Sequence, residues 1–231
     1  MRGARWLVRP LLLVGLAFIA IAMVRSSLGF VLRSTDPALA LRFDPDNAAA
    51  LAARAEQLLR DDPSEKNRIL AEALARRALR RSPVSADGAR MLATTRDMAG
   101  DEARARQLMD YSQSLSRRDF PTQIWFIEDA IGRNDIAGAL RHYDIALRTS
   151  AATKALLFPV LIKATAQPAV AAPLIDTLAA RPLWADPFLE QASREAPDPE
   201  GLARLIVGLA RRHYPLSPTT VAQASARIAD R

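Results

Sequence analysis

The chain has 231 residues, of which 50% are hydrophobic and 25% charged, a composition that predicts a folded globular protein and excludes collagenous and disordered classes. With no Cys and only two His, it can form no disulfide, thiolate nucleophile or Cys-ligated zinc site, and we expect no enzymatic activity, cofactor or metal. Of the net charge of +7, +5 lies in residues 1–33, so the remainder is near neutral. That distribution is typical of membrane targeting, and we expect no nucleic-acid partner.

Residues 10–24 form an uncharged and almost wholly apolar run, and a second apolar stretch at 28–32 follows it. As a helix, the first run rises about 22 Å against a hydrocarbon core of about 30 Å, so Arg9 and Arg25 must extend toward the headgroups or the helix must continue. We therefore predict that residues 1–33 form a basic N-terminus and a single transmembrane helix, a signal anchor that contacts the membrane through residues 10–32. The positive-inside rule then places the N-terminus in the cytoplasm and the body in the periplasm, at a bacterial inner membrane.

A cleaved signal peptide is the alternative for the same segment. Residues 20–22, Ala-Ile-Ala, fit an A-x-A-like cleavage site after a basic and then an apolar region. Cleavage there would release the body from the membrane.

From residue 34 onward, Ala and Leu recur at three- and four-residue spacing, and no alternating apolar runs typical of strands occur. This pattern predicts an all-α body of helices of about 10 to 16 residues with short turns, because the breaks carry Pro, Gly and N-capping residues. The breaks fall at residues 44–47, 61–64, 82–83, 99–101, 119–121, 132–135, 149–150, 167–168, 181–182, 196–199 and 214–215.

Comparing the chain with itself reveals a repeat at an offset of 34 residues, in which two columns consist of small side chains. Three columns repeat at this offset: Ala71, Ala105 and Ala139; Ala78, Ser112 and Ala146; and Ala75, Met109 and Tyr143. Two antiparallel helices whose axes lie about 8–10 Å apart need side chains without bulk where they cross. We predict that these residues line the packing seams between helices.

The pattern resembles the tetratricopeptide repeat, whose second-helix signature is clearest at residues 139–147, with weaker copies at 71–79 and 105–115. The resemblance implies an α-solenoid of helical hairpins, preceded here by the transmembrane helix. It assigns residues 34–150 to tetratricopeptide-like repeats and residues 151–231 to degenerate hairpins and a capping helix. The later helices are expected at 151–163, 169–180, 184–193 and 199–212, with the cap at 221–228.

In tetratricopeptide proteins the first helix of each unit lines a concave groove that receives a partner protein. Here the groove positions are Glu56, Arg60, Arg90, Thr94, Asp97 and Glu128. Because these side chains are polar and of mixed sign, an ordinary solvated face is the alternative. The partner's identity and the oligomeric state are left open.

The aromatic, His and clustered Arg residues are expected either in the core or on the surface. Trp125, Phe126, Trp184 and Phe188 are expected to be core anchors. His142 is expected on a helix surface and His213 at a helix end. The Arg runs are expected to complement the ends of second helices, with contact to an anionic lipid or polymer as the alternative: Arg76, Arg77, Arg80, Arg81, Arg117, Arg118, Arg211 and Arg212.

We therefore expect a non-catalytic, membrane-anchored scaffold that binds another protein. The whole arrangement resembles small repeat proteins of alphaproteobacterial cell-envelope and exopolysaccharide loci, which points to envelope or exopolysaccharide assembly. The alternative is a cleaved, secreted periplasmic protein that binds an acidic polymer through its Arg-rich helix ends.

Overall fold

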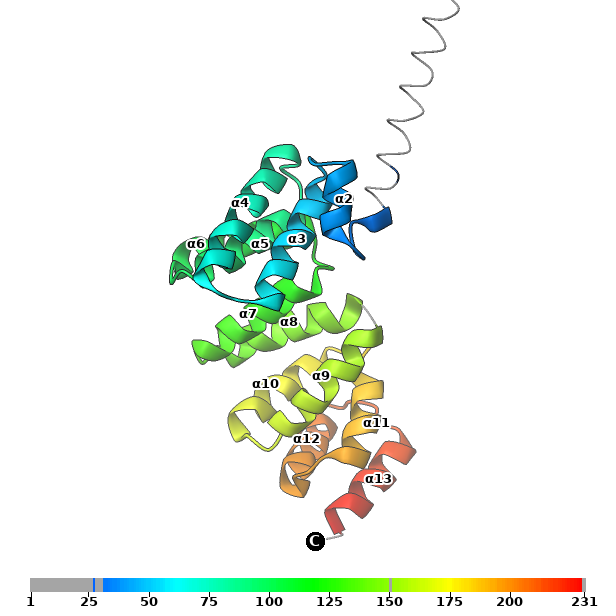
Figure 1. Ribbon diagram of the computed structural model, residues 1–231. Helices are drawn as coiled ribbons and strands as arrows, with labels where there is room; N and C mark the ends of the chain where they lie inside the picture. Colours follow the sequence, from blue (N-terminus) through cyan, green and yellow to red (C-terminus); the bar gives the residue numbers. More distant parts are fainter. Residues whose placement is uncertain (1–26, 28–30, 150, 230–231) are drawn as a thin grey trace, which may run out of the picture. The chain divides into compact units, whose positions relative to one another are not determined.

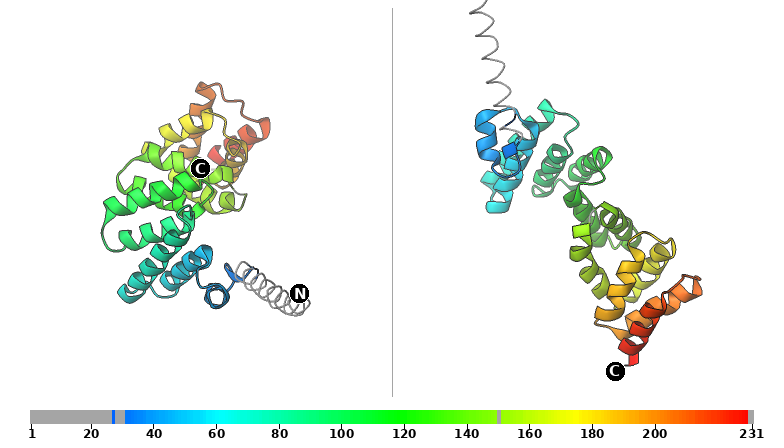
Figure 2. Two further views of the ribbon diagram at one scale, coloured as in Figure 1. Left: turned by 90° about the horizontal axis from the view of Figure 1, so that it is seen from above. Right: turned by 90° about the vertical axis from the view of Figure 1, so that its right-hand side faces the viewer.

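The computed structural model describes residue 27 and residues 31–149 and 151–229. The apolar run 10–24 of the predicted transmembrane segment lies outside these residues, and no helix among those described has the length and apolar character needed to cross a membrane. Within the described part the protein is all-α, with 12 helices and no strand. Both views of Figure 2 show the helices joined by short connections. The all-α prediction is therefore confirmed.

The helices begin and end close to the predicted breaks. They are α2 (Pro37–Phe43), α3 (Ala48–Asp61), α4 (Glu65–Arg81), α5 (Ala86–Asp97), α6 (Glu102–Leu115), α7 (Phe120–Gly132), α8 (Ile136–Thr149), α9 (Ala151–Ala164), α10 (Pro168–Ala179), α11 (Ala185–Glu195), α12 (Pro199–Arg211) and α13 (Pro218–Ala229). The predicted cap at 221–228 corresponds to α13, which starts three residues earlier, at Pro218.

Short polar side chains start most of these helices. Each accepts a hydrogen bond from a backbone N–H in the first turn: Asp36, Asn47, Ser64, Ser85, Asp101, Asp119, Asp135, Asp198 and Ser217. Such a cap stabilises a helix by about 1 kcal/mol, because it satisfies a backbone donor that has no partner within the helix. Because the capping residues recur at most helix starts, the sequence alone predicts the turns between the helices.

The described chain divides into two compact units, one ending at Ser116 and the other starting at Arg117. In the first unit α3 packs on α4 and α5 on α6 as hairpins, and α3 and α4 each pack on α5 (Figure 1). The predicted boundary at residue 150 marks where the repeat pattern fades, and it stays a prediction.

Alanines line the helix crossings of the first unit. Ala71, Ala75 and Ala78 of α4 and Ala105 of α6 are all 0% exposed, and Ser112 is equally buried. In the second unit Ala139, Ala146 and Tyr143 of α8 are also buried. The side chains at the 34-residue spacing are therefore buried.

The second unit begins with the hairpin of α7 and α8 and then changes its packing. Backbone contacts there join alternate helices, with α10 on α8 and α12, and α11 on α9 and α13, besides the sequential pairs α8–α9 and α12–α13. In Figure 1, α10 and α12 lie on one side of this unit, and α9, α11 and α13 on the other. The predicted helices are confirmed, and after residue 150 contacts between alternate helices accompany those between sequential ones.

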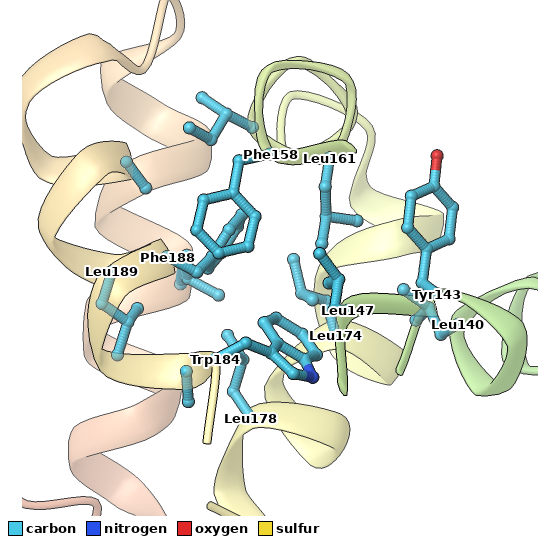
Figure 3. Close-up of a cluster of buried hydrophobic side chains, with 14 of the residues drawn as sticks. Leu140, Tyr143, Leu147, Phe158, Leu161, Leu174, Leu178, Trp184, Phe188 and Leu189 are labelled. Atoms are coloured by element: carbon cyan, nitrogen blue, oxygen red, sulfur yellow. The ribbon is translucent and has the colours of Figure 1, made fainter. Parts of the chain in front are cut away.

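Large side chains fill the core of the second unit. Trp184 and Phe188 are fully buried and meet nearly edge to face, with ring centroids 5.8 Å apart, and Phe158 packs against both (Figure 3). The indole Nε1 of Trp184 donates to Asp144 Oδ1 at 2.8 Å, so the buried ring keeps a hydrogen-bond partner. The predicted anchoring roles of Trp184 and Phe188 are confirmed.

Two glycines set how closely α12 approaches its neighbours. A Cβ on Gly201 would lie 2.6 Å from the backbone carbonyl oxygen of Thr165, and one on Gly208 would lie 2.3 Å from Cδ1 of Ile175 in α10. The first contact is with backbone, which cannot rotate away. Gly201 is therefore required for the position of α12.

The alanine seam predicts the effect of a larger side chain at residue 105. Ala105→Leu inserts bulk at a fully buried position of α6, so we expect the free energy of unfolding to fall by about 1–3 kcal/mol through overpacking. Ala103, exposed on the same helix, provides the matched control Ala103→Leu. Thermal and urea unfolding measure both variants, and equal stability of the two would contradict the seam.

Candidate partner-binding surface

Helices α3 and α5 pack side by side and carry five of the six predicted groove residues. These five are named the α3/α5 surface: Glu56, Arg60, Arg90, Thr94 and Asp97. The sixth, Glu128, is exposed on α7, in the second unit.

Ion pairs connect the two helices across this surface. Arg90 Nη2 donates to Glu56 Oε2 at 2.9 Å, joining α5 to α3, and Arg60 Nη2 donates to the other carboxylate oxygen at 2.6 Å. Thr94 lies one turn beyond Arg90, and its Oγ1 donates to the carbonyl oxygen of Arg90 at 3.0 Å. Four of the five residues therefore form one connected set, while Asp97 lies exposed in the last turn of α5.

The groove prediction required the side chain of Arg90 to face solvent, and it does not. Its side chain is only 10% exposed, whereas that of Arg60 is 68% exposed. A buried guanidinium needs acidic partners, and Arg90 has Glu56 across the helix interface and Asp87 one turn earlier at 3.6 Å. Its position favours the pairing of α3 with α5, whereas Arg60 and Asp97 are exposed.

The pKa of Glu56 follows from the same contacts. Partial burial raises this pKa, but the hydrogen bonds and positive charges of Arg90 and Arg60 outweigh burial, and the net effect lowers it below its ordinary value of 4.5. Glu56 is consequently ionised at neutral pH and holds both guanidiniums.

Sequence reasoning missed a second charged cluster, between α4 and α5. Glu72 accepts from Arg76 at 2.6 Å, from Arg96 at 2.7 Å and from Arg68 at 3.2 Å. Arg68 and Arg76 stand four residues before and after Glu72, a spacing visible in the sequence. The contact with Arg96 joins α4 to α5 and has no such local signal.

A third cluster joins the C-terminal turns of α4 to the chain before α3. Asp46 pairs with Arg77 at 2.8 Å and also with Arg81. Three of the four Arg in the predicted runs of α4 therefore share two carboxylates: Arg76 uses Glu72, and Arg77 and Arg81 use Asp46.

Two aromatic residues of α7, Phe126 and Trp125, were expected to be core anchors. Phe126 is buried, whereas Trp125 is half-buried. The ring of His142 stacks on Phe126 with centroids 4.5 Å apart, and its Nδ1 lies 2.9 Å from Oε1 of the buried Gln123. His142 is thus half-buried and part of the α7–α8 packing rather than an ordinary surface residue.

A cavity of about 390 Å³ opens in the second unit between α11 and the chain that joins α12 to α13. Tyr214 Oη donates to Asp186 Oδ1 at 2.6 Å on its wall. Burial, and then the carboxylate of Asp186, raise the pKa of Tyr214 far above its ordinary value. The tyrosine is therefore a neutral donor, and its hydrogen bond fixes the chain after α12 against α11.

The ion pair of the α3/α5 surface predicts the effect of neutralising its carboxylate. Glu56→Gln leaves Arg90 without its cross-helix charge, and we expect a loss of about 1–2 kcal/mol in the free energy of unfolding at neutral pH, discounted for the partial exposure of Glu56. Because the folded-state pKa of Glu56 is lowered, this contribution is present above pH 4.5 and disappears as the pH falls through the folded-state value. Urea unfolding of wild type and variant across this pH range measures the difference.

Glu65→Gln is the matched control, since Glu65 pairs with Arg68 within α4 and is 69% exposed. We expect it to have a smaller effect than Glu56→Gln. Equal losses from the two substitutions would contradict a special role for the cross-helix pair.

Among residues 31–149 and 151–229, no group of three or more acidic or His side chains is placed to hold a metal ion. The chain matches no model of a known protein family and no curated protein. The functional conclusion consequently depends on the contacts and charges of the chain itself.

Proposed function

We propose that the protein is a non-catalytic, membrane-anchored scaffold that binds another protein through the α3/α5 surface. The observation that carries this proposal is the Glu56–Arg90 ion pair, which holds two neighbouring helices of the repeat side by side. Arg60, Thr94 and Asp97 are thereby presented from one rigid pair of helices. A preordered surface loses less side-chain freedom when a partner binds than a mobile one does.

The chemistry of this surface suits a helix or an extended segment of a protein. Arg60 is largely exposed, and Asp97 places a carboxylate at the end of α5. Mixed charges at the rim of an interface favour specificity and the rate of association, while neutral contacts supply affinity. A polyanion would instead require a surface with one sign of charge.

The anchor in the proposal is supported by the sequence alone. Residues 10–24 are apolar, and Arg2, Arg5 and Arg9 precede them, which favours a cytoplasmic N-terminus and a periplasmic body at a bacterial inner membrane. A role in cell-envelope or exopolysaccharide assembly is supported by the resemblance to small repeat proteins of such loci.

Site-specific photo-crosslinking tests the binding surface. A photoreactive amino acid at Thr94 in the membrane-bound full-length chain is expected to form a crosslink to a discrete protein, and Arg60→Glu is expected to reduce its yield severalfold. The same photoreactive residue at the exposed position of Ala103 on α6 is the matched control. Equal crosslinking from both positions, or none from Thr94, would overturn the surface.

The mature N-terminus tests the anchor. We expect mass spectrometry of the protein purified from membranes to find the segment from Met1 to Val24 intact, with the protein resistant to carbonate extraction. A mature chain that starts near Met23 and is released in soluble form would instead favour the secreted, polymer-binding alternative.

A further inference from the structure

The outward side of α4 combines basic and apolar side chains. Directly opposite the buried Ala71, Ala75 and Ala78, the helix exposes a set of residues that we name the α4 outer face. It consists of Lys66, Ile69, Leu70, Ala73, Arg77 and Arg80. A helix that buries one face on its neighbours normally turns an ordinary polar face to water, and α4 departs from this pattern.

Ile69 and Leu70 are 54% and 45% exposed. Both are branched aliphatic side chains, yet they lie on the exposed side of α4 and not on its buried side. Ala73 lies one turn beyond Ile69 and is also exposed. Scattered exposed hydrophobic residues need no explanation, but these three are contiguous on one helix face.

Positive charge surrounds these apolar residues and exceeds the available negative charge. Helix α4 carries six basic and two acidic side chains. The acidic Glu65 is paired with Arg68 at 2.6 Å, and Glu72 is shared by three Arg. Among the described residues Lys66 and Arg80 have no ion-pair partner, and Arg77 shares Asp46 with Arg81. Lys66 and Arg80 are therefore cationic donors on this face that no acidic side chain of the described residues neutralises.

We propose that the α4 outer face binds the surface of an anionic phospholipid membrane. Apolar side chains enter the boundary between headgroups and acyl chains, while the long stems of Lys and Arg let their charges reach the phosphates. Each basic residue near an anionic bilayer adds to the attraction, and the effect is screened by salt.

The exposed Ile69 and Leu70 favour a membrane over a soluble acidic polysaccharide. A hydrated polyanion gains from the cations but offers no apolar phase for two aliphatic side chains, whereas a bilayer accommodates both. This lipid contact goes beyond the partner-binding function, since it uses the opposite helix of the α3–α4 hairpin.

A single fluorescent label tests the proposal in the full-length chain. Because the protein contains no Cys, Ala73→Cys creates one labelling site on the α4 outer face for an environment-sensitive dye. Residues 10–24 are expected to hold the chain on any vesicle, so the measurement is the local protection of the dye from aqueous iodide. We expect protection on vesicles of phosphatidylcholine with phosphatidylglycerol, little on phosphatidylcholine alone, and loss of protection at high salt.

Two controls separate this face from general effects. Ala172→Cys labels an exposed alanine on α10, a helix without a basic residue, and is expected to show no protection. In the Ala73→Cys background, Lys66→Glu with Arg80→Glu is expected to weaken the protected state more than about tenfold. Arg118→Glu with Arg211→Glu changes the net charge equally at exposed positions of the second unit and is expected to leave it unchanged.

Three outcomes would overturn the proposal. One is equal iodide quenching at residue 73 on both kinds of vesicle, and another is an equal effect of the two charge-reversed pairs. The third is protection of the dye by dissolved polygalacturonate to the same degree as by anionic vesicles, which would assign the face to an acidic polymer. Circular dichroism of each variant checks that the helices are retained.

Discussion

Close approach of neighbouring helices is the constraint on which the first unit depends. The crossings of α4 are occupied by Ala71, Ala75 and Ala78, each fully buried, so backbone and Cβ atoms of neighbouring helices meet directly. Such a seam buries little apolar area per residue and gains its stability from dense packing over its length. It also specifies the arrangement, because a shift of one residue along the helix would bring Glu72 or Arg76 into the crossing.

The second unit uses a different kind of core. There Trp184, Phe188 and Phe158 form an aromatic cluster, and leucines of α10, α11 and α12 surround it. Large side chains separate helices, and α12 compensates at Gly201 and Gly208, where the absence of a Cβ restores close approach. The change from alanine seams to bulky anchors explains why the 34-residue pattern fades in the sequence although helices continue to α13.

Helix bounds and seams were predictable because their signals are local. Asn47, Ser85 and Asp101 each cap a helix within three residues, and the alanine columns repeat at a constant offset. The packing of α10 with α8 and α12 was not predictable, since contacts between alternate helices leave no periodic trace in the sequence. The burial of Arg90 was missed for a related reason, because a charged residue is assigned to the surface unless its acidic partner on another helix is known.

The candidate surfaces of the first unit are consequences of its thin core. With alanines at most of the buried positions between them, α3, α4 and α5 lie close enough for long side chains to bridge neighbouring helices, as Glu56 does to Arg90 and Glu72 to Arg96. Each bridge removes a flexible side chain from solvent and orders the exposed residues beside it, which favours recognition on the α3/α5 surface. The two carboxylates of α4 are too few to neutralise its six basic side chains. Positive charge therefore faces outward on the α4 outer face. The composition of the seam and the charge of the surface are therefore linked, and a chain rich in both alanine and arginine builds the two together.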